Sequence, residues 1–370
     1  MDELLEYSVV YTDRALNHMS GTFQGVMRDI SATLCQVYNS AAAVVVPGSG
    51  TFGMESVARQ FADGEDVLVV RNGWFSFRWS QIFDAGGFAS SVDVMAAAPD
   101  SDAVDAQFSP AALADVQARI RETKPAVVFA PHVETSAGLM LPDDYIAGLA
   151  DAVHEVGGLL VIDCIASGTI WLDMAVLGID VLISAPQKGW SGPPCCGLVM
   201  MSEAAVARCR ETESSSFAMN LRQWLDIMDA YLNGGHAYHA TMPTESLRVF
   251  RDVMQETVAF GVSEVKAAQV ELGTRIRGVL AERGIRSVAA PGFEAPGVVV
   301  SHTGVATMKS GAAFAAEGMQ IAGGVPLRCG EHEDFSTFRL GLFGLDKLGD
   351  IDAAVGRFEQ TLDRVLAEVD

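Results

Sequence analysis

Positive charge is scarce in this chain. Of its 370 residues only 25 are lysine or arginine, against 47 aspartates and glutamates, and the formal net charge is −22. Nucleic-acid binding needs cations clustered along a phosphate backbone. The composition therefore argues against a nucleic-acid partner. The few arginines remain available to create a local positive pocket for a small anionic substrate.

Long apolar runs are also missing. No uninterrupted apolar stretch reaches the roughly 18 residues that span a bilayer. The N-terminus is acidic and has neither a basic leading segment nor the apolar core of a secretion signal. We therefore expect no membrane contact and a cytoplasmic protein. Because 49% of the residues are hydrophobic, the chain can bury a large core, and its length predicts two structural domains.

Metal-binding patterns are absent as well. The six cysteines form no C-x-x-C pair and no zinc-type spacing with histidine. They are Cys35, Cys164, Cys195, Cys196, Cys209 and Cys329. The sequence thus predicts no metal site. Cys164 is expected to be a small buried residue at a strand end rather than a nucleophile.

One of the five lysines occupies an unusual position. Lys188 follows the apolar run 181–184 and opens a Gly/Pro-rich segment, 189–194. Lysines in loops after strands often serve solubility alone. A lysine held where a strand ends can instead be desolvated and used as an amine nucleophile.

A carboxylate stands at the end of another predicted strand. The run 159–162 leads directly into Asp163, and ligand sites of open α/β sheets lie at the carboxyl ends of strands. Pyridoxal chemistry needs such a pair: a lysine to hold the aldehyde carbon and an aspartate to keep the pyridine nitrogen protonated. We therefore interpret Lys188 as a Schiff-base lysine for pyridoxal 5'-phosphate. A helix N-cap is the alternative role for Asp163.

A turn of small residues suits the phosphate of this cofactor. Pro47–Thr51 separates a predicted strand, 41–46, from an amphipathic helix over 53–61. Turn amides, two hydroxyls and a helix N-terminus would converge there on one anion. After the next strand, 67–70, comes the aromatic segment 71–79, from which one ring would cover the cofactor face. Most rings of that segment are expected to be ordinary core.

Strands alternate with helical stretches through the first two thirds of the chain. The predicted strands cover residues 41–46, 67–70, 126–130, 159–162, 181–184 and 197–201. Repeated strand–helix units predict an α/β fold, a mostly parallel sheet with helices on both faces. A long helical pattern over 244–283 and a strand-like segment, 297–301, predict a smaller C-terminal α+β domain. We place the large domain at residues 1–255 and the small one at 256–370.

Seven short segments lie in one order along nearly the whole chain. They are Pro47–Thr51, Asn72–Gly73, His132–Gly138, Val161–Asp163, Ser184–Lys188, Tyr238–Thr241 and Phe338–Gly341. Together they resemble the class V pyridoxal-phosphate-dependent aminotransferases, most closely their alanine/serine–glyoxylate branch. The resemblance implies the fold-type-I architecture, in which the large domain carries a seven-stranded-type, mostly parallel sheet. It also implies an obligate homodimer with shared active sites.

The resemblance assigns roles residue by residue. It implies that Lys188 is the catalytic lysine that carries the cofactor, and that Asp163 contacts the pyridine nitrogen. The other implied cofactor contacts are Ser49, Gly50, Thr51 and Gln187 for the phosphate, Phe75 and Ile165 for the two ring faces, and Tyr238 and Thr241 for the phosphate of the partner subunit. Ser136 would lie near the substrate, and Arg339 would bind the substrate carboxylate. An internal salt bridge is the alternative for Arg339.

The expected activity is a ping-pong transamination that moves an amino group from alanine or serine to glyoxylate or pyruvate. Alternatives are a transaminase for a phosphonate, a ureido-amino acid, an acidic amino acid or pyridoxamine, or a lyase of the same superfamily. A non-catalytic binding protein would have no reason to keep both Lys188 and Asp163. Arg328 is either a surface residue or a contact for a second anionic group on a dicarboxylic or phosphonate donor.

Overall fold

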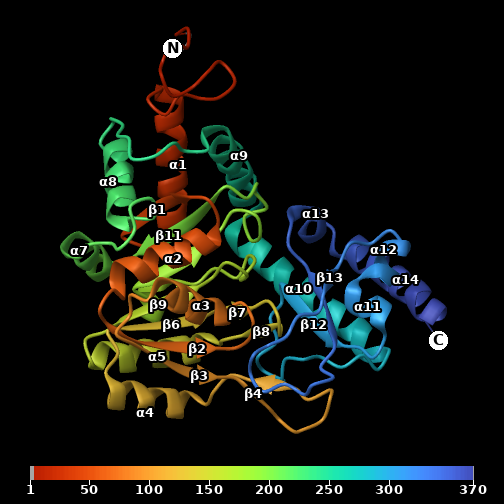
Figure 1. Ribbon diagram of the computed structural model, residues 1–370. Helices are drawn as coiled ribbons and strands as arrows, with labels where there is room; N and C mark the ends of the chain where they lie inside the picture. Colours follow the sequence, from red (N-terminus) through yellow and green to blue (C-terminus); the bar gives the residue numbers. More distant parts are fainter. Residues whose placement is uncertain (1–3, 370) are drawn as a thin grey trace.

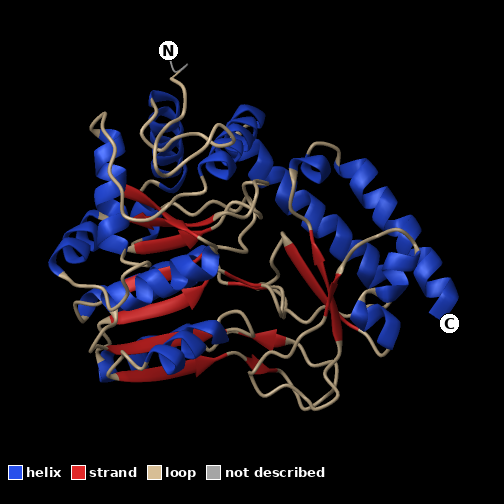
Figure 2. Cartoon of the chain, turned by 45° about the horizontal axis from the view of Figure 1, so that its top comes forward, coloured by secondary structure: helices blue, strands red, loops and turns tan. Residues whose placement is uncertain are grey.

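A seven-stranded sheet forms the centre of the larger part of the molecule (Figures 1 and 2). The strands lie in the order β1 (Ala42–Pro47), β11 (Cys196–Met201), β10 (Val181–Ser184), β9 (Leu159–Asp163), β6 (Val127–Pro131), β2 (Asp66–Arg71) and β3 (Ser91–Ala96). Only β11 runs against the others. The predicted α/β fold with a mostly parallel, seven-stranded sheet is therefore confirmed.

The computed structural model describes residues 4–369. Residues 1–3 and 370, the outer ends of the two predicted domain ranges, lie outside the described part. Within that part, no helix is both long enough and apolar enough to cross a membrane.

Helices connect and cover the strands. Those of the N-terminal two thirds are α1 (Gly21–Tyr38), α2 (Gly50–Phe61), α3 (Phe77–Gly86), α4 (Leu113–Thr123), α5 (Asp143–Glu155), α6 (Met174–Leu177), α7 (Glu203–Glu211), α8 (Leu221–Leu232) and α9 (Thr244–Phe260). Helix α2 packs on β10 and β11, and α5 packs on β9. The central strands β6, β9, β10 and β11 are buried along their whole length, which explains their nearly continuous apolar sequences.

The C-terminal part is a smaller α+β unit, drawn in blue in Figure 1. Its antiparallel sheet has the order β12 (Val298–His302), β14 (Thr337–Gly341) and β13 (Ala322–Gly323). The helices are α10 (Val262–Glu282), α11 (Ala306–Ser310), α12 (Ala312–Ala316), α13 (Leu345–Leu348) and α14 (Ile351–Val369). Two small hairpins, β4 (Ala98–Pro99) with β5 (Phe108–Ser109) and β7 (Val133–Glu134) with β8 (Leu139–Met140), complete the fold. The domain limit predicted at residue 255 falls inside α9 and stays a prediction.

Three elements differ from the sequence-based expectation. The helical pattern over 244–283 is two helices, because Gly261 between α9 and α10 has φ of 110°, a conformation that only glycine adopts readily. Helix α2 begins at Gly50, three residues earlier than predicted. Strand β3 was not predicted, because it is the half-exposed edge of the sheet and lacks the apolar run of a buried strand.

The carboxyl ends of the parallel strands meet at one edge of the sheet. Asp163, the last residue of β9, lies beside Pro131 of β6 and Ile183 of β10 in the strand register. The segments that follow β1, β2, β6 and β10 start from the same edge. The fold thus brings together residues that are far apart in the sequence, as the general rule for open α/β sheets requires.

Candidate active site

Lys188 lies four residues beyond the end of β10, in the loop between β10 and β11. Its side chain is half-buried, and within residues 4–369 its Nζ atom forms no hydrogen bond or ion pair. Burial lowers the pKa of the Lys188 ammonium, Asp163 and Glu134 oppose this, and Arg339 and Arg78 add to it. A lowered pKa favours the neutral amine, which is the nucleophilic form of lysine.

The backbone beside Lys188 is packed tightly. A Cβ atom on Gly189 would lie only 2.0 Å from the carbonyl oxygen of Gly168. No other residue type fits there without a backbone shift. This contact fixes the position from which the Lys188 side chain projects.

Asp163 is 8% exposed, and its Oδ1 accepts a hydrogen bond from the Ile165 amide at 2.9 Å. Burial raises the pKa of its carboxyl to about 6, while the Ile165 amide, Lys188 and Arg78 lower it. Asp163 caps no helix, since the next helix, α6, begins at Met174. A buried carboxylate without an ion pair among the described residues suits a cationic ligand atom.

The turn Pro47–Thr51 leads into the N-terminus of α2. Ser49 is the N-cap residue, but its side chain makes no capping hydrogen bond. The first amides of α2 and the Ser49 hydroxyl are therefore available to an anion. A Cβ atom on Gly50 would lie 2.5 Å from Cδ1 of Ile165, so the turn packs directly against the residue that follows β9 and Cys164.

The glycines of this turn, Gly48, Gly50 and Gly53, have the G-x-G-x-x-G spacing of dinucleotide-binding loops. That motif works where the strand before it belongs to a parallel βαβ unit. Here β1 is an edge strand whose only neighbour, β11, is antiparallel. The structural context of a dinucleotide site is therefore missing.

Arg78 was not singled out from the sequence. Its Nη1 atom donates to Thr51 Oγ1 at 3.0 Å, and its guanidinium carbon lies 5.5 Å from the centroid of the Phe75 ring. It also acts electrostatically on both Asp163 and Lys188. Arg78 thus connects the turn Pro47–Thr51 with Lys188 and Asp163. The available signal was an arginine inside the aromatic segment 71–79, which also contains Arg71.

Glu134 is the second residue that the sequence interpretation missed. Its side chain is fully buried. Oε1 accepts hydrogen bonds from the amide and hydroxyl of Ser136, at 3.0 and 2.7 Å, and from the Phe75 amide at 3.1 Å. Oε2 accepts from the amide and hydroxyl of Ser76, at 2.9 and 2.6 Å. A carboxylate inside the otherwise buried motif His132–Gly138 was the signal for this role.

The two predicted residues nearest to Glu134 are Ser136 and Phe75. Ser136 is fully buried; its hydroxyl donates to Glu134 and accepts from the Trp74 amide at 2.9 Å. Phe75 is half-buried, and the guanidinium carbons of Arg78 and Arg339 each lie 5.5 Å from its ring centroid. The segment after β2 therefore presents a ring between two cations.

Arg339 comes from β14 of the small sheet. Its Nε atom donates to the carbonyl oxygen of Gly323 at 2.8 Å, which orients the guanidinium. Burial lowers the pKa of Arg339, while Glu134 raises it. Within the described residues Arg339 forms no salt bridge, so the internal ion pair considered as an alternative is not present.

Three predicted residues are not drawn into this cluster. The Gln187 side chain is exposed beside Lys188. Tyr238 is 56% exposed, and its hydroxyl lies 3.1 Å from the hydroxyl of Thr241, which is also exposed. In one copy of the chain, this pair thus faces outward.

His132 and Cys164 adjoin the cluster as structural residues. Burial lowers the pKa of the His132 imidazole to about 3, and its Nδ1 atom lies 2.7 Å from Ser167 Oγ. Burial raises the pKa of the Cys164 thiol. The imidazole and the thiol are therefore both neutral near pH 7. Cys164 is buried just after the end of β9, as expected from the sequence.

Comparison with known proteins identifies relatives along most of the chain. A 2-aminoethylphosphonate–pyruvate transaminase of Burkholderia ambifaria is 28% identical, covering 95% of this chain and 92% of the relative. One from Paraburkholderia phymatum is 29% identical, covering 93% and 89%. No family model matches the chain.

Solved structures share the fold. Alanine–glyoxylate aminotransferase from Nostoc sp. superposes with a TM-score of 0.79 at 19% identity, over 95% of this chain and 89% of the other. Ureidoglycine–glyoxylate aminotransferase from Bacillus subtilis gives 0.78 at 18% identity, over 96% and 89%.

Proposed function

Because the chain belongs to the class V pyridoxal-phosphate-dependent aminotransferase family, we propose that it moves an amino group from a small, anionic amino donor to pyruvate or glyoxylate. The observation that carries this proposal is the charged cluster in which Lys188 lies within electrostatic reach of both Asp163 and Arg339. Such a cluster places an amine (Lys188), a carboxylate (Asp163) and a guanidinium that can bind a substrate anion (Arg339) close together.

The side chains fit the cofactor of the family. When bound, pyridoxal phosphate supplies an electron sink for the electrons left on the substrate carbon after a proton is removed. Lys188 is the proposed attachment point and proton carrier, because burial lowers its pKa and so favours the neutral amine, the form that can accept a proton. Asp163, with a carboxyl pKa of about 6, is ionised at neutral pH and can keep the pyridine nitrogen protonated.

The phosphate would bind at the start of α2. The proposed contacts are Ser49, Gly50, Thr51 and Gln187, to which the structure adds Arg78 as a charged neighbour of Thr51. Phe75 and Ile165 are the proposed contacts of the two ring faces. Ile165 is suited to this role because it packs against Gly50 and its amide orients Asp163.

Arg339 is the proposed anchor of the substrate anion. Its Nε donates to the carbonyl oxygen of Gly323, so the two terminal nitrogens remain for a ligand. These two nitrogens can donate paired hydrogen bonds to a carboxylate or a phosphonate. Ser136 retains one lone pair beside its two hydrogen bonds, so a substrate contact through it is compatible with its burial.

Two donor classes follow from the relatives. The named activity of the Burkholderia and Paraburkholderia proteins favours a phosphonate donor with pyruvate as acceptor. The second candidate, alanine or serine with glyoxylate, comes from the seven-segment resemblance in the sequence, and the Nostoc alanine–glyoxylate aminotransferase shares the fold. Arg339 alone suits either class, because both phosphonate and carboxylate accept paired hydrogen bonds from guanidinium.

We further propose a homodimer in which Tyr238 and Thr241 complete the partner's phosphate site. Exposed apolar side chains support this proposal, because a partner subunit would cover them. Leu4, Leu5, Tyr7, Phe217 and Tyr238 are all more than half exposed in the single chain. Apolar exposure on this scale is typical of a protein interface. A cytoplasmic location stays a prediction from the sequence.

The absorbance of the bound cofactor tests the proposed function. Each candidate donor added alone should change the visible absorbance band of the bound cofactor, and pyruvate or glyoxylate should restore it. Lys188→Ala should abolish the covalent link that borohydride traps in the native enzyme. No conversion with any amino donor, or a trapped link in the alanine variant, would show that the proposal is wrong.

A further inference from the structure

The segment after β2 collects arginines that lack acidic partners. Most arginines of residues 4–369 form ion pairs with Asp or Glu, as Arg59, Arg283 and Arg364 do. Four that form none lie on the rings of this segment: Arg71, Arg78, Arg328 and Arg339. These four guanidiniums repel one another and have no acidic partner that would offset the repulsion, although the protein carries a net charge of −22.

Arg78 and Arg339 share the Phe75 ring, whereas Arg71 and Arg328 share the Phe77 ring. The guanidinium carbons of Arg71 and Arg328 lie 4.7 and 5.8 Å from the centroid of Phe77. Arg328 is also 5.6 Å from the centroid of Trp74, the residue directly before Phe75. The Phe75 and Phe77 rings are two residues apart in the segment after β2, so the two pairs of arginines lie next to each other along it.

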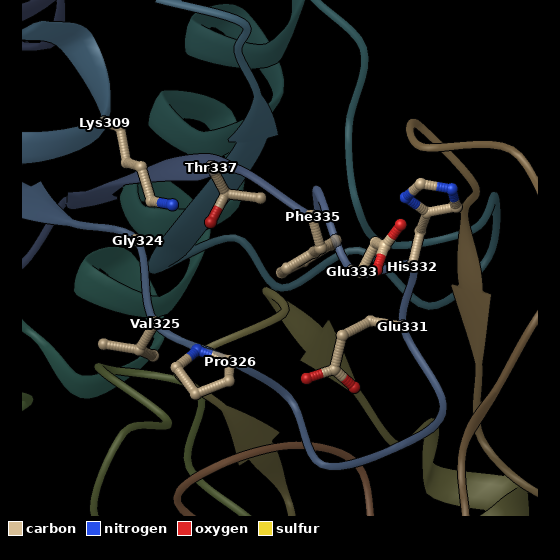
Figure 3. Close-up of a pocket in the computed structure, with 9 residues that line it drawn as sticks. All are labelled: Lys309, Gly324, Val325, Pro326, Glu331, His332, Glu333, Phe335 and Thr337. Carbon is tan, nitrogen blue, oxygen red and sulfur yellow. The ribbon is translucent and has the colours of Figure 1, made fainter. Parts of the chain in front are cut away.

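Arg328 has an exposed side chain on a backbone that is held in place. Its φ of 65° is a left-handed conformation that costs free energy in a residue with a Cβ atom. The Glu331 carboxylate maintains it by accepting the amides of Leu327, Arg328 and Cys329 at 2.7, 3.0 and 2.9 Å. Figure 3 shows Glu331 on the wall of a cavity of about 310 Å³, with its carboxylate turned toward Pro326.

Arg71 is incompletely satisfied. One terminal nitrogen donates to Ser80 Oγ at 2.8 Å, but the Nε atom is buried and has no hydrogen-bond partner. Burial lowers the pKa of Arg71, and Arg328 lowers it further, against the opposing effects of Cys329 and Asp84. An unpaired buried donor next to a second cation is stabilised by an anion placed between them.

We propose that Arg71 and Arg328 form a second anion-binding site beside Arg339, and that the preferred substrate carries two anionic groups. This inference rests on the proposed function and narrows it: Arg339 binds one group, and the Arg71–Arg328 pair binds a second carboxylate, phosphonate or phosphate of the same molecule. The substrate class is thus a dicarboxylic amino acid, or one that carries a phosphonate or phosphate beside its carboxylate, with the corresponding keto acid; 2-aminoethylphosphonate, which has no carboxylate, falls outside it. A donor with one anionic group would leave the second pair of cations unpaired.

Ligand binding to the holoenzyme tests this site without turnover. Calorimetry would compare 3-phosphonopropionate, which has two anionic groups, with butyrate, which has one. We expect the native enzyme to bind the first at least about tenfold more tightly, since hydrogen bonds to charged groups are stronger than those between neutral groups. Arg328→Gln should reduce this ratio to near one.

A matched control removes the same charge elsewhere. Arg357 on α14 is exposed and forms no ion pair within the described residues, so Arg357→Gln should keep the native ratio. Arg71→Gln should lower the ratio as Arg328→Gln does, with its thermal midpoint recorded because Arg71 also contacts Ser80. An equal ratio in the native enzyme and Arg328→Gln would overturn the inference.

The single half reaction separates this inference from the proposed function. If no amino donor converts the cofactor band, the proposed function fails. If alanine and aspartate both convert it, and Arg328→Gln slows both by the same factor, only the second site fails. Loss of dimer stability in Arg328→Gln with an unchanged ligand ratio would mean that Arg328 binds the partner subunit instead.

Discussion

Ser76 and Glu134 are joined twice, although they are 58 residues apart: the amide and the hydroxyl of Ser76 both donate to Oε2 of Glu134, at 2.9 and 2.6 Å. The same carboxylate accepts the Phe75 amide. One buried side chain thus fixes the loop after β2 against the segment after β6. The positions of Phe75, and through it of the guanidiniums on its ring, depend on this link.

The first prediction follows from that link. Glu134→Gln keeps the size of the side chain but replaces one carboxylate oxygen with an NH2 group. This donor faces the backbone amides of Phe75, Ser76 or Ser136, which are donors too, so at least one buried N–H loses its acceptor. We expect the free energy of unfolding to fall by about 3 kcal/mol, measured by urea denaturation. Glu333→Gln, the same change at an exposed position, should stay within about 0.5 kcal/mol of the native protein. A native-like stability for Glu134→Gln would show that the network is unimportant.

A pH dependence follows from Asp163. Its carboxyl pKa rises from 3.8 to about 6 on folding, mainly through burial. Between these values the folded chain binds more protons than the unfolded chain, so its stability falls as pH rises. Above pH 6 the ionised carboxylate costs about 3 kcal/mol, at 1.36 kcal/mol for each pKa unit.

Asp163→Asn should therefore stabilise the cofactor-free protein at pH 8 by up to about 3 kcal/mol, and by roughly half as much at pH 5. Urea denaturation at the two pH values measures the difference. Asp102→Asn, at an exposed site, is the control. In the holoenzyme the same variant should retain cofactor but slow the half reaction by orders of magnitude. A gain in stability that does not vary with pH would exclude the raised pKa as its cause.

A third prediction concerns Arg339. Arg339→Lys replaces a planar fork by a point charge and removes the Nε contact with Gly323. We expect kcat/KM to fall by about tenfold or more for amino donors and keto acceptors alike, because both halves of a ping-pong cycle use one site. Cofactor absorbance and dimer mass should not change. Reduced thermal stability with native kinetics would instead assign Arg339 a structural role.

The fourth prediction tests the shared site. A Lys188→Ala subunit is combined with a subunit carrying Tyr238→Phe and Thr241→Ala. If Tyr238 and Thr241 serve the partner, the hybrid contains one doubly damaged site and one intact site. Its activity should then reach about half that of the native dimer, as one of two equal sites is restored. The prediction is wrong if the purified heterodimer is no more active than the homodimer that carries both Tyr238→Phe and Thr241→Ala. Tyr238 and Thr241 would then serve the active site of their own subunit, or no active site.

The sequence determined the elements that depend on local pattern. The buried strands were located to within one or two residues, because strands covered on both faces are continuous apolar runs. Asp163 stood out because it closes such a run, and Lys188 because it lies shortly after one. Parallel strands end at a common edge, so both residues were expected there. The half-exposed β3 was missed because it lacks an apolar run, and the break at Gly261 was missed because the helical pattern continues across it.

Only the tertiary structure decided which residues meet at that edge. Glu134 and Arg78 carried only a weak local signal, a carboxylate inside a motif and an arginine inside an aromatic segment. Their roles come from hydrogen bonds to Ser76 and Thr51, which are distant in sequence. The contact of Arg339 with Phe75, and the sharing of the Phe77 ring by Arg71 and Arg328, likewise depend on how residues of the C-terminal part lie against the segment after β2. Pairing of charges is a property of distance in space, which local sequence patterns do not encode.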